Sequence, residues 1–378
     1  MDYETLKLVW WLLVGVLLVG FAIMDGHDMG MGVLLPFVGR NDLERRAVIN
    51  TVAPHWDGNQ VWFITAGGAI FAAWPLVYAT AFSGFYWAMM AALWALFFRP
   101  VGFDYRSKIK HPLWRSTWDW GLFIGGAVPP IIFGVAFGNL LQGVPFHFDD
   151  ILMSTYTGSF WQLLNPFALL AGVVSLGMIT LQGATYLMMR TEGDIYRRVR
   201  TASLLFAVLT IAAFALAGVW VASGIDGYVI TSAVDPNALP DPLAKTVSTA
   251  AGAWMGNYEK YGWAIWVPVA AFAALAASIL FSRLHQAGAA FWSSSLANAG
   301  IIGTAGVSMF PFVMPSSTDP RSSLTVYDAV SSHLTLGLML GATVIFMPLI
   351  VFYTSWAYKV MWGKVTTEYV AANDKSVY

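Results

Sequence analysis

The sequence contains no cysteine, and only 11% of its 378 residues are charged. The lack of cysteine excludes disulfides, iron–sulfur clusters and thiolate chemistry. Ordinary soluble domains carry about 25% charged residues, so the shortage of charge argues against that class. The formal net charge of −1 gives no overall basic character that would indicate a nucleic-acid partner. The first residues, MDYETLKLVWW, lack the basic region and cleavage site of a signal peptide, so we expect a retained first helix.

Apolar residues make up 58% of the chain, and the mean hydropathy is +0.63. They fall in runs of about twenty or more, the length that a helix needs to cross a hydrocarbon core of about 30 Å. A single helix over 48–98 would be about 76 Å long, so it must turn once, near Trp74-Pro75 or Phe82-Ser83-Gly84. We therefore predict one all-α integral membrane domain. Its nine predicted spans are approximately 8–36, 48–74, 78–98, 118–140, 160–188, 202–223, 262–282, 288–312 and 332–358.

The placement of lysine and arginine supports nine spans with the N-terminus outside. In this arrangement sixteen of the 20 basic residues lie on the inner side, as the positive-inside rule requires. The other four, Lys7, Lys245, Lys260 and Arg321, lie outside. The longest outer loop is 224–261, which is rich in Pro, Asp and Gly. The sequence therefore predicts an outer N-terminus and an inner, cytoplasmic C-terminus.

Two acids interrupt the first span, in the stretch DGHDMGMG. An ionisable group near a bilayer centre costs roughly 2.5–3.5 kcal/mol, so Asp25 and Asp28 need an explanation. They are three residues apart and share a helix face, which suits either a structural hydrogen bond or a proton or cation pathway. Gly26 and Gly30 form a G-x-x-x-G pair suited to close helix approach. His27 should project away from both acids, so we expect a structural role for it and no joint Asp–His metal site.

A second polar cluster, PHWDGNQVW, lies near the inner end of the second span. Asp57 and Gln60 share one face, and His55 and Asn59 share another. By helix rise, Asp57 and Asp28 lie at comparable depths, with Asp28 about 12 Å from the inner end of its span. Three carboxylates could therefore line one water-accessible wedge open to the cytoplasm. The alternative is that His55 and Asp57 sit in interfacial water.

No cofactor motif stands out among the remaining residues. No pair of histidine or methionine residues has a helix context that favours haem ligation, and we predict no metal site. The sixteen methionines are explained as core filling. In FFRPVGFDYR, the default for Arg99 and Asp104 is a local salt bridge or a lipid contact.

Six stretches together closely resemble subunit II of the cytochrome bd-type ubiquinol oxidases: DGHDMGMG, PHWDGNQVW, GGAIFAAWP, FFRPVGFDYR, NLLQGVPF and MFPFVMPSS. The similarity runs along essentially the whole chain. It implies two four-helix bundles plus one peripheral helix, paired with a similarly built subunit I in a bacterial inner membrane. Small single-helix accessory subunits and membrane lipids are further partners that the family suggests.

The resemblance also implies a function. The family enzyme oxidises ubiquinol and reduces dioxygen to water, generating proton motive force without pumping. Subunit I ligates two haems b and one haem d, so no catalytic residue is expected in this chain, although it could bind a quinone. By motif match, Asp57 is the residue expected on the route of protons from the cytoplasm, followed by Asp25 and Asp28. The alternatives are a proton- or cation-coupled secondary transporter and a purely structural assembly subunit.

Overall fold

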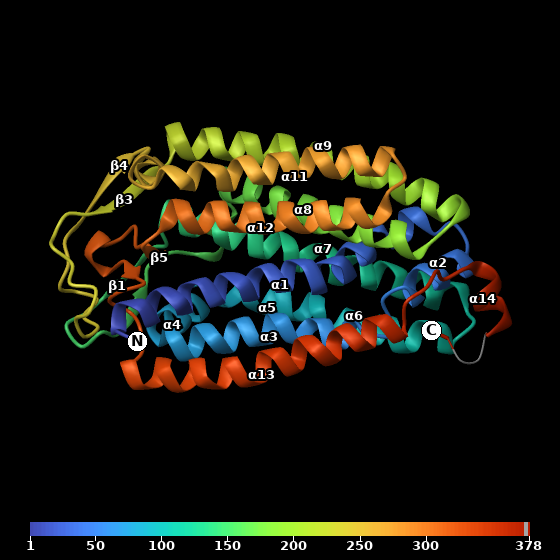
Figure 1. The fold of residues 1–378 in the computed structure, drawn as a ribbon, viewed down its shortest axis with the longest axis horizontal. Coiled ribbons are helices and arrows are strands. Elements are labelled where there is room, and N and C mark those ends of the chain that lie inside the picture. Colours follow the sequence, from blue (N-terminus) through green and yellow to red (C-terminus); the bar gives the residue numbers. More distant parts are fainter. Residues whose placement is uncertain (374–376) are drawn as a thin grey trace.

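The computed structural model describes residues 1–373 and 377–378. Its long helices run side by side, and short β-hairpins gather at one end of the bundle (Figure 1). The N-terminus lies at this hairpin end and the C-terminus at the opposite end, beside α2 (Asp42–Asn50), which we call the α2 end (Figure 1). Termini at opposite ends are what an odd number of crossings produces.

The first helix, α1 (Tyr3–Val38), includes the whole first predicted span. It begins where the Asp2 side chain accepts a hydrogen bond from the Thr5 amide at 3.3 Å, which satisfies one of the free donors of the first turn. Its 36 residues correspond to about 54 Å of helix. The helix therefore extends well beyond a hydrocarbon core.

The second and third predicted spans are broken more often than the sequence indicated. Residues 48–50 end α2, residues 51–55 form turns, and α3 (Trp56–Ala73) begins only after Pro54. The chain then bends by 119° between α3 and α4 (Pro75–Gly84), at one of the two predicted turn positions. Proline cannot donate a backbone hydrogen bond and restricts the residue before it, which explains why both breaks lie beside a proline.

The rest of the chain is mostly helical, with short 3₁₀ turns beside the helix ends. The further helices are α5 (Tyr86–Leu96), α6 (Phe98–Tyr105), α7 (Pro112–Gln142), α8 (Pro166–Arg190), α9 (Gly193–Gly224), α10 (Gly256–Lys260), α11 (Trp266–Arg283), α12 (Ala287–Met309), α13 (His333–Val360) and α14 (Thr367–Ala372). The strands form three antiparallel pairs: β1 (Phe146–Phe148) with β2 (Ser154–Tyr156), β3 (Asp226–Ile230) with β4 (Val247–Ala251), and β5 (Phe312–Met314) with β6 (Leu324–Thr325). The predicted outer loop 224–261 contains the β3–β4 pair and α10.

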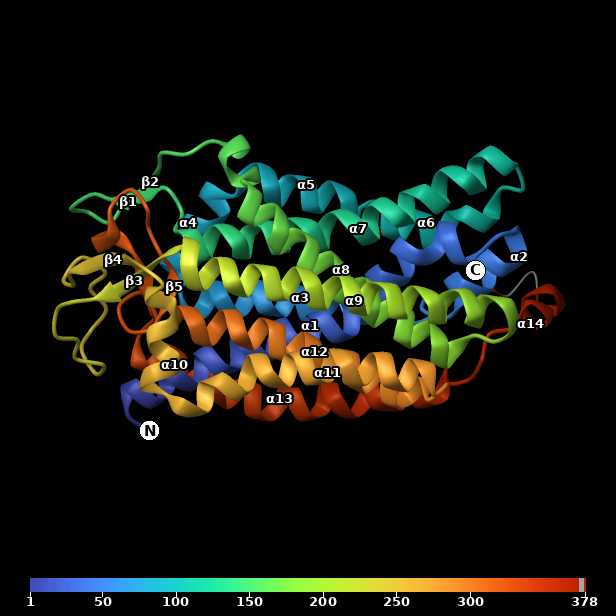
Figure 2. The ribbon, with the colours of Figure 1, turned by 90° about the horizontal axis from the view of Figure 1, so that it is seen from above.

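The long helices pack as two groups with one helix outside them. One group contains α1, α3, α5–α6 and α7, and the other contains α8, α9, α11 and α12, with α8 packed against both α1 and α7. Figure 2 shows α5 and α6 on one side of the bundle and α13 on the opposite side. Leu336 is the one buried residue of α13, so this helix is peripheral.

Within the described residues, seven helices are long and apolar enough to cross a membrane, and an eighth span results if α3 and α4 count as one. The helix α12, which covers most of the predicted span 288–312, is outside this set because its serines and glycines make it less apolar. Ser294 and Ser295 are buried against α8, where Ser294 donates to Gln182 at 2.6 Å. The all-helical multi-pass fold is confirmed, and nine spans stays a prediction.

The predicted close approach at Gly26 and Gly30 is present between α1 and α8. A Cβ atom on Gly30 would lie 2.3 Å from the carbonyl oxygen of Ile179 and 2.9 Å from the backbone of Gly183. Helices in a membrane associate through such backbone contacts because lipid supplies little hydrophobic driving force. This contact fixes α1 next to α8 over the turn that carries the two acids.

Candidate functional site

The two acids of α1 are buried in the interior of the bundle. Asp25 and Asp28 are each 1% exposed. They share the same helix, yet their carboxylates contact different neighbouring helices, α6 for Asp25 and α3 for Asp28. The two acids therefore form two separate sites.

Asp25 is paired with Arg99 of α6, which is itself buried. Nη1 of Arg99 donates to Oδ2 of Asp25 at 2.9 Å, and Nη2 donates to Oδ1. Both carboxylate oxygens are thus occupied in a two-pronged ion pair, the arrangement that best offsets the cost of burying charge. The default interpretation of Arg99, a local salt bridge or a lipid contact, is wrong because its partner lies 74 residues away on another helix.

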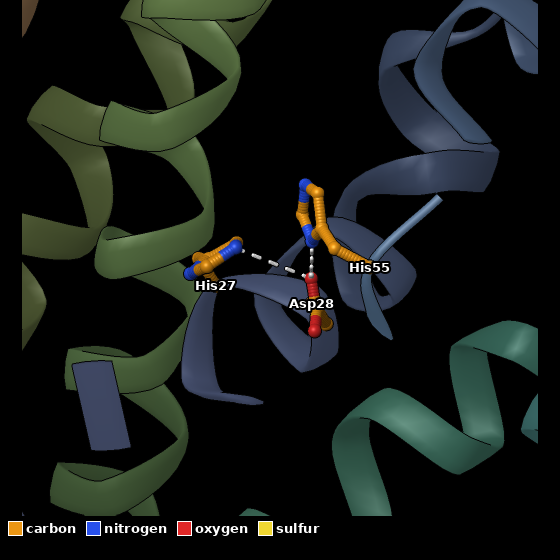
Figure 3. A group of neighbouring side chains, drawn as sticks. All are labelled: His27, Asp28 and His55. Carbon is orange, nitrogen blue, oxygen red and sulfur yellow. Dashed lines mark ion pairs between the residues drawn. The ribbon is translucent and has the colours of Figure 1, made fainter. Parts of the chain in front are cut away.

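Of the two carboxylate oxygens of Asp28, one accepts a hydrogen bond and the other is open, meaning that no donor reaches it. Its Oδ2 accepts a hydrogen bond from Nδ2 of Asn59 at 2.8 Å. Its Oδ1 is buried and receives no hydrogen bond from the described residues. The nearest groups are two imidazoles, with His27 Nε2 at 3.3 Å and His55 Nδ1 at 4.0 Å (Figure 3).

This geometry corrects the predicted orientation of His27, whereas the prediction of no metal site stays untested. His27 does not project away from the acids, because the ring turns back toward the next residue in α1. An Asp–His group that could hold a metal ion is also present, made of His27, Asp28 and His55. Helix spacing indicates only the direction in which a side chain leaves the helix, whereas the imidazole of His27 turns its Nε2 atom toward the adjacent carboxylate.

The faces of both imidazoles are covered by tyrosines. His27 stacks on Tyr186 with ring centroids 4.1 Å apart, and His55 lies 4.4 Å from Tyr358 of the peripheral helix. At the coordinating edges, the Tyr358 hydroxyl lies 3.3 Å from both His27 Nε2 and His55 Nδ1, where a porphyrin would have to lie. The His27–His55 pair therefore does not fit a haem.

Asp57 does not join the buried acids. It lies in the first turn of α3 and is exposed on the surface of the chain, while His55 and Asn59 from the same segment are buried against Asp28. The predicted division of this segment into two faces is therefore present. The predicted wedge lined by three carboxylates is not, because two of them are enclosed and the third faces outward.

Sequence reasoning missed Arg99, Tyr186 and Tyr358 as parts of this site. The sequence does contain an indication for Arg99, since an arginine at the end of an apolar run is a candidate counter-ion for an acid inside another span. It contains no such indication for the two tyrosines, because aromatic residues are frequent throughout this sequence.

A separate apolar cavity of about 670 Å³ lies between α1, α7, α8, α9, α11 and α12. Its wall includes Phe21, Phe133, Phe167, Phe214, Ile301 and Tyr258. Tyr258 provides a polar group toward the hairpin end, where its hydroxyl lies 2.8 Å from that of Ser308. Burial raises the pKa of the Tyr258 hydroxyl above its usual value, so it keeps its proton at neutral pH.

Comparison with known proteins connects these features to a family. The family model described as cytochrome bd terminal oxidase subunit II matches residues 6–361. The chain is 58% identical to the cytochrome bd-I ubiquinol oxidase subunit 2 of Escherichia coli over the whole length of both. It is 33% identical to the cytochrome bd ubiquinol oxidase subunit 2 of Bacillus subtilis, over 95% of this chain and 96% of that one.

A solved structure shares the fold. A chain of the bd oxidase from Geobacillus thermodenitrificans superposes with a TM-score of 0.62 at 15% identity, covering 94% of this chain and 98% of that chain. The full-length match to the family model and the high identity to its curated relatives lead to one conclusion. The chain belongs to the family of subunit II of the cytochrome bd terminal oxidases.

Proposed function

We propose that this subunit carries protons from the cytoplasm toward the haems of a partner subunit I, using Asp57 at the surface and Asp28 in the interior. In this proposal the complex oxidises ubiquinol and reduces dioxygen to water, with two haems b and one haem d held by subunit I. The protons consumed in that reaction cannot cross dry hydrocarbon, so they need side chains that can accept and release them.

The observation that carries the proposal is the open Oδ1 atom of Asp28. Asn59 connects the other oxygen of Asp28 to the first turn of α3, the turn that presents Asp57 at the surface. Oδ1 of Asp28 lies 3.3 Å from His27 Nε2, an acceptor to which a proton on Oδ1 could be passed. A carboxylate closed on both oxygens, such as Asp25, offers no comparable position.

The arrangement of charge supports a cytoplasmic location for the α2 end. Arg45, Arg46 and Arg198 belong to helix segments at this end, whereas Lys7 and Lys245 lie toward the hairpin end (Figure 1). The positive-inside rule then places the N-terminus in the periplasm of a bacterial inner membrane. Asp57, near the start of α3, is on the cytoplasmic side in this orientation.

The apolar cavity supports a bound quinone in this subunit. Its volume and its lining suit an isoprenoid tail, and the protonated Tyr258 hydroxyl could donate to a quinone oxygen. Organic extraction of the purified complex followed by chromatography would measure the quinone content.

The substitution Asp57→Asn tests the proton route. Asparagine keeps the size of the side chain but cannot carry a proton, so quinol-driven oxygen uptake should slow at least several-fold while the haem absorbance stays normal. Asp104→Asn is the matched control, since Asp104 is also an exposed acid and lies on α6. Unchanged oxygen uptake in Asp57→Asn would leave only a structural role for this residue.

A further inference from the structure

Around Asp28, several hydrogen-bond acceptor atoms face one another, and fewer donors than acceptors lie among them. His27 Nδ1 lies 2.9 Å from the carbonyl oxygen of Ile23, so that nitrogen must carry the ring proton and Nε2 is a free acceptor. Tyr186 donates its hydroxyl proton to the carbonyl of Thr51 at 3.1 Å. The Tyr186 oxygen therefore accepts from His55 Nε2, 2.9 Å away, and leaves the lone pair of His55 Nδ1 pointing inward.

Three acceptors thus converge: His27 Nε2, His55 Nδ1 and Asp28 Oδ1. These atoms all lie within 4.8 Å of one another, and the residues are enclosed in the bundle (Figure 3). Asn59 Nδ2 donates to Asp28 Oδ2 at 2.8 Å and to His55 Nδ1 at 3.1 Å, and Asp28 Oδ1 receives no hydrogen bond from the described residues. Convergent buried acceptors need a positive species among them.

We propose that this cluster is a binding site for one divalent transition-metal ion of the zinc class. Two imidazole nitrogens and a carboxylate oxygen are the donor set that such ions prefer over the oxygen-only sets of Mg²⁺ and Ca²⁺. The inference does not rest on the proposed proton route, although a bound ion would occupy the same Asp28 Oδ1 and His27 Nε2 atoms and would exclude a proton from them.

The distances suit a tetrahedral site with Tyr358 as the fourth ligand. Bonds of about 2.0–2.1 Å in a tetrahedron separate neighbouring ligand atoms by about 3.3–3.4 Å. His27 Nε2 lies 3.3 Å from Asp28 Oδ1, and the Tyr358 hydroxyl lies 3.3 Å from His27 Nε2 and 3.3 Å from His55 Nδ1. The His55–Asp28 separation of 4.0 Å must shorten when a metal ion binds.

Each of the three inner ligands is also held in place by its other polar atom. The outer contacts are the Ile23 carbonyl to His27, the Tyr186 hydroxyl to His55, and the Asn59 amide to Asp28. Such outer partners orient the ligands of known metal sites and fix the histidine tautomer. If Tyr358 binds as a phenolate, releasing its proton to water, the two negative ligands match the charge of a dication.

Zinc content measures this proposal directly. The purified oxidase complex, equilibrated with Zn²⁺ and freed of excess metal by gel filtration, should hold one more zinc per complex than the His27→Phe variant by elemental mass spectrometry. Tyr358→Phe should bind at least tenfold more weakly, because three ligands remain. His111→Gln, which removes an exposed histidine that is not part of the cluster, should keep the zinc of the wild type.

Haem content per complex shows whether each variant assembles. If His27→Phe fails to assemble, X-ray absorption at the zinc edge of the wild type decides the question, because the site requires nitrogen and oxygen neighbours at about 2.0 Å with scattering from two imidazoles. Equal zinc in the wild type and an assembled His27→Phe variant, or a spectrum without imidazole scattering, would overturn the proposal and leave a proton as the species held there.

Discussion

Asp25 and Asp28 are one helical turn apart in α1 and equally buried, but their carboxylates have different partners. Asp25 meets Arg99, which binds both carboxylate oxygens and neutralises the charge. Asp28 meets neutral groups, of which only Asn59 donates to it, and Oδ1 faces two imidazole nitrogens. Among the buried carboxylate oxygens of the described residues, Oδ1 of Asp28 is the one without a donor.

This difference shows how two acids in one membrane helix can have separate roles. A carboxylate whose two oxygens are both paired links the helices on which the partners lie, as a brace. The energy of its ion pair opposes any change of protonation. A buried carboxylate with one oxygen that receives no hydrogen bond can gain a proton or a cation at little structural cost. The comparison predicts that changes at Asp25 act on assembly and changes at Asp28 act on turnover.

The largest effect is expected from Arg99→Met. Methionine preserves much of the apolar volume but leaves Asp25 as an unpaired buried charge, which costs about 3–5 kcal/mol. The yield of assembled complex and its thermal denaturation midpoint should both fall sharply.

The double variant Asp25→Leu with Arg99→Met serves as the control for this loss. It removes both charges at once, so most of the lost stability should return, as for other buried ion pairs replaced by apolar residues. If the double variant is as unstable as Arg99→Met alone, Arg99 supports the bundle through packing and the description of Asp25 as its brace is incorrect.

A smaller effect on stability, but a clear one on activity, is expected from Asp28→Asn. The asparagine can still accept from Asn59, so the complex should assemble with normal haem absorbance. Quinol-driven oxygen uptake should drop several-fold because an amide cannot take up and release a proton. Normal uptake in this variant, or a loss of assembly comparable to that of Arg99→Met, would remove the distinction between the two acids.

The smallest effect is expected at Glu44, whose ion pair is partly exposed to solvent, unlike that of Asp25. Both oxygens of Glu44 accept from Arg198 at 2.8 Å, so the pair has the same two-pronged form but lies at the edge of the bundle. Surface pairs contribute about 0–1 kcal/mol, so Glu44→Gln should lower the denaturation midpoint only slightly.

The pH dependence of this small effect has a definite sign. The hydrogen bond from Arg198 lowers the pKa of Glu44 below its ordinary value of 4.5. The stabilisation is therefore fully present above pH 4.5 and is lost as the pH falls through the lowered pKa. Denaturation midpoints of the wild type and Glu44→Gln should converge in acid, and a difference that persists there would show that the charge of Glu44 is not its cause.

The sequence predicted some local features of the site correctly and left others open. Gly30 was expected at a close helix contact, and its backbone does meet Gly183. His55 and Asn59 were expected on one face, and both are buried against Asp28. The predicted orientation of the His27 side chain was wrong, because side-chain rotamers depend on neighbours that the sequence does not identify.

The fold class follows from the sequence because a bilayer accepts long apolar helices and few other structures, and the signs of the loop charges indicate their direction. The same physics shows that acids within a span need partners. Which partner each acid receives was decided only by the tertiary structure, since Arg99 and Asn59 reach α1 from helices that are remote in the chain. The rotation and depth of those helices give Asp25 a donor at both carboxylate oxygens and Asp28 a donor at only one. Both the rotation and the depth depend on packing contacts spread over the whole bundle.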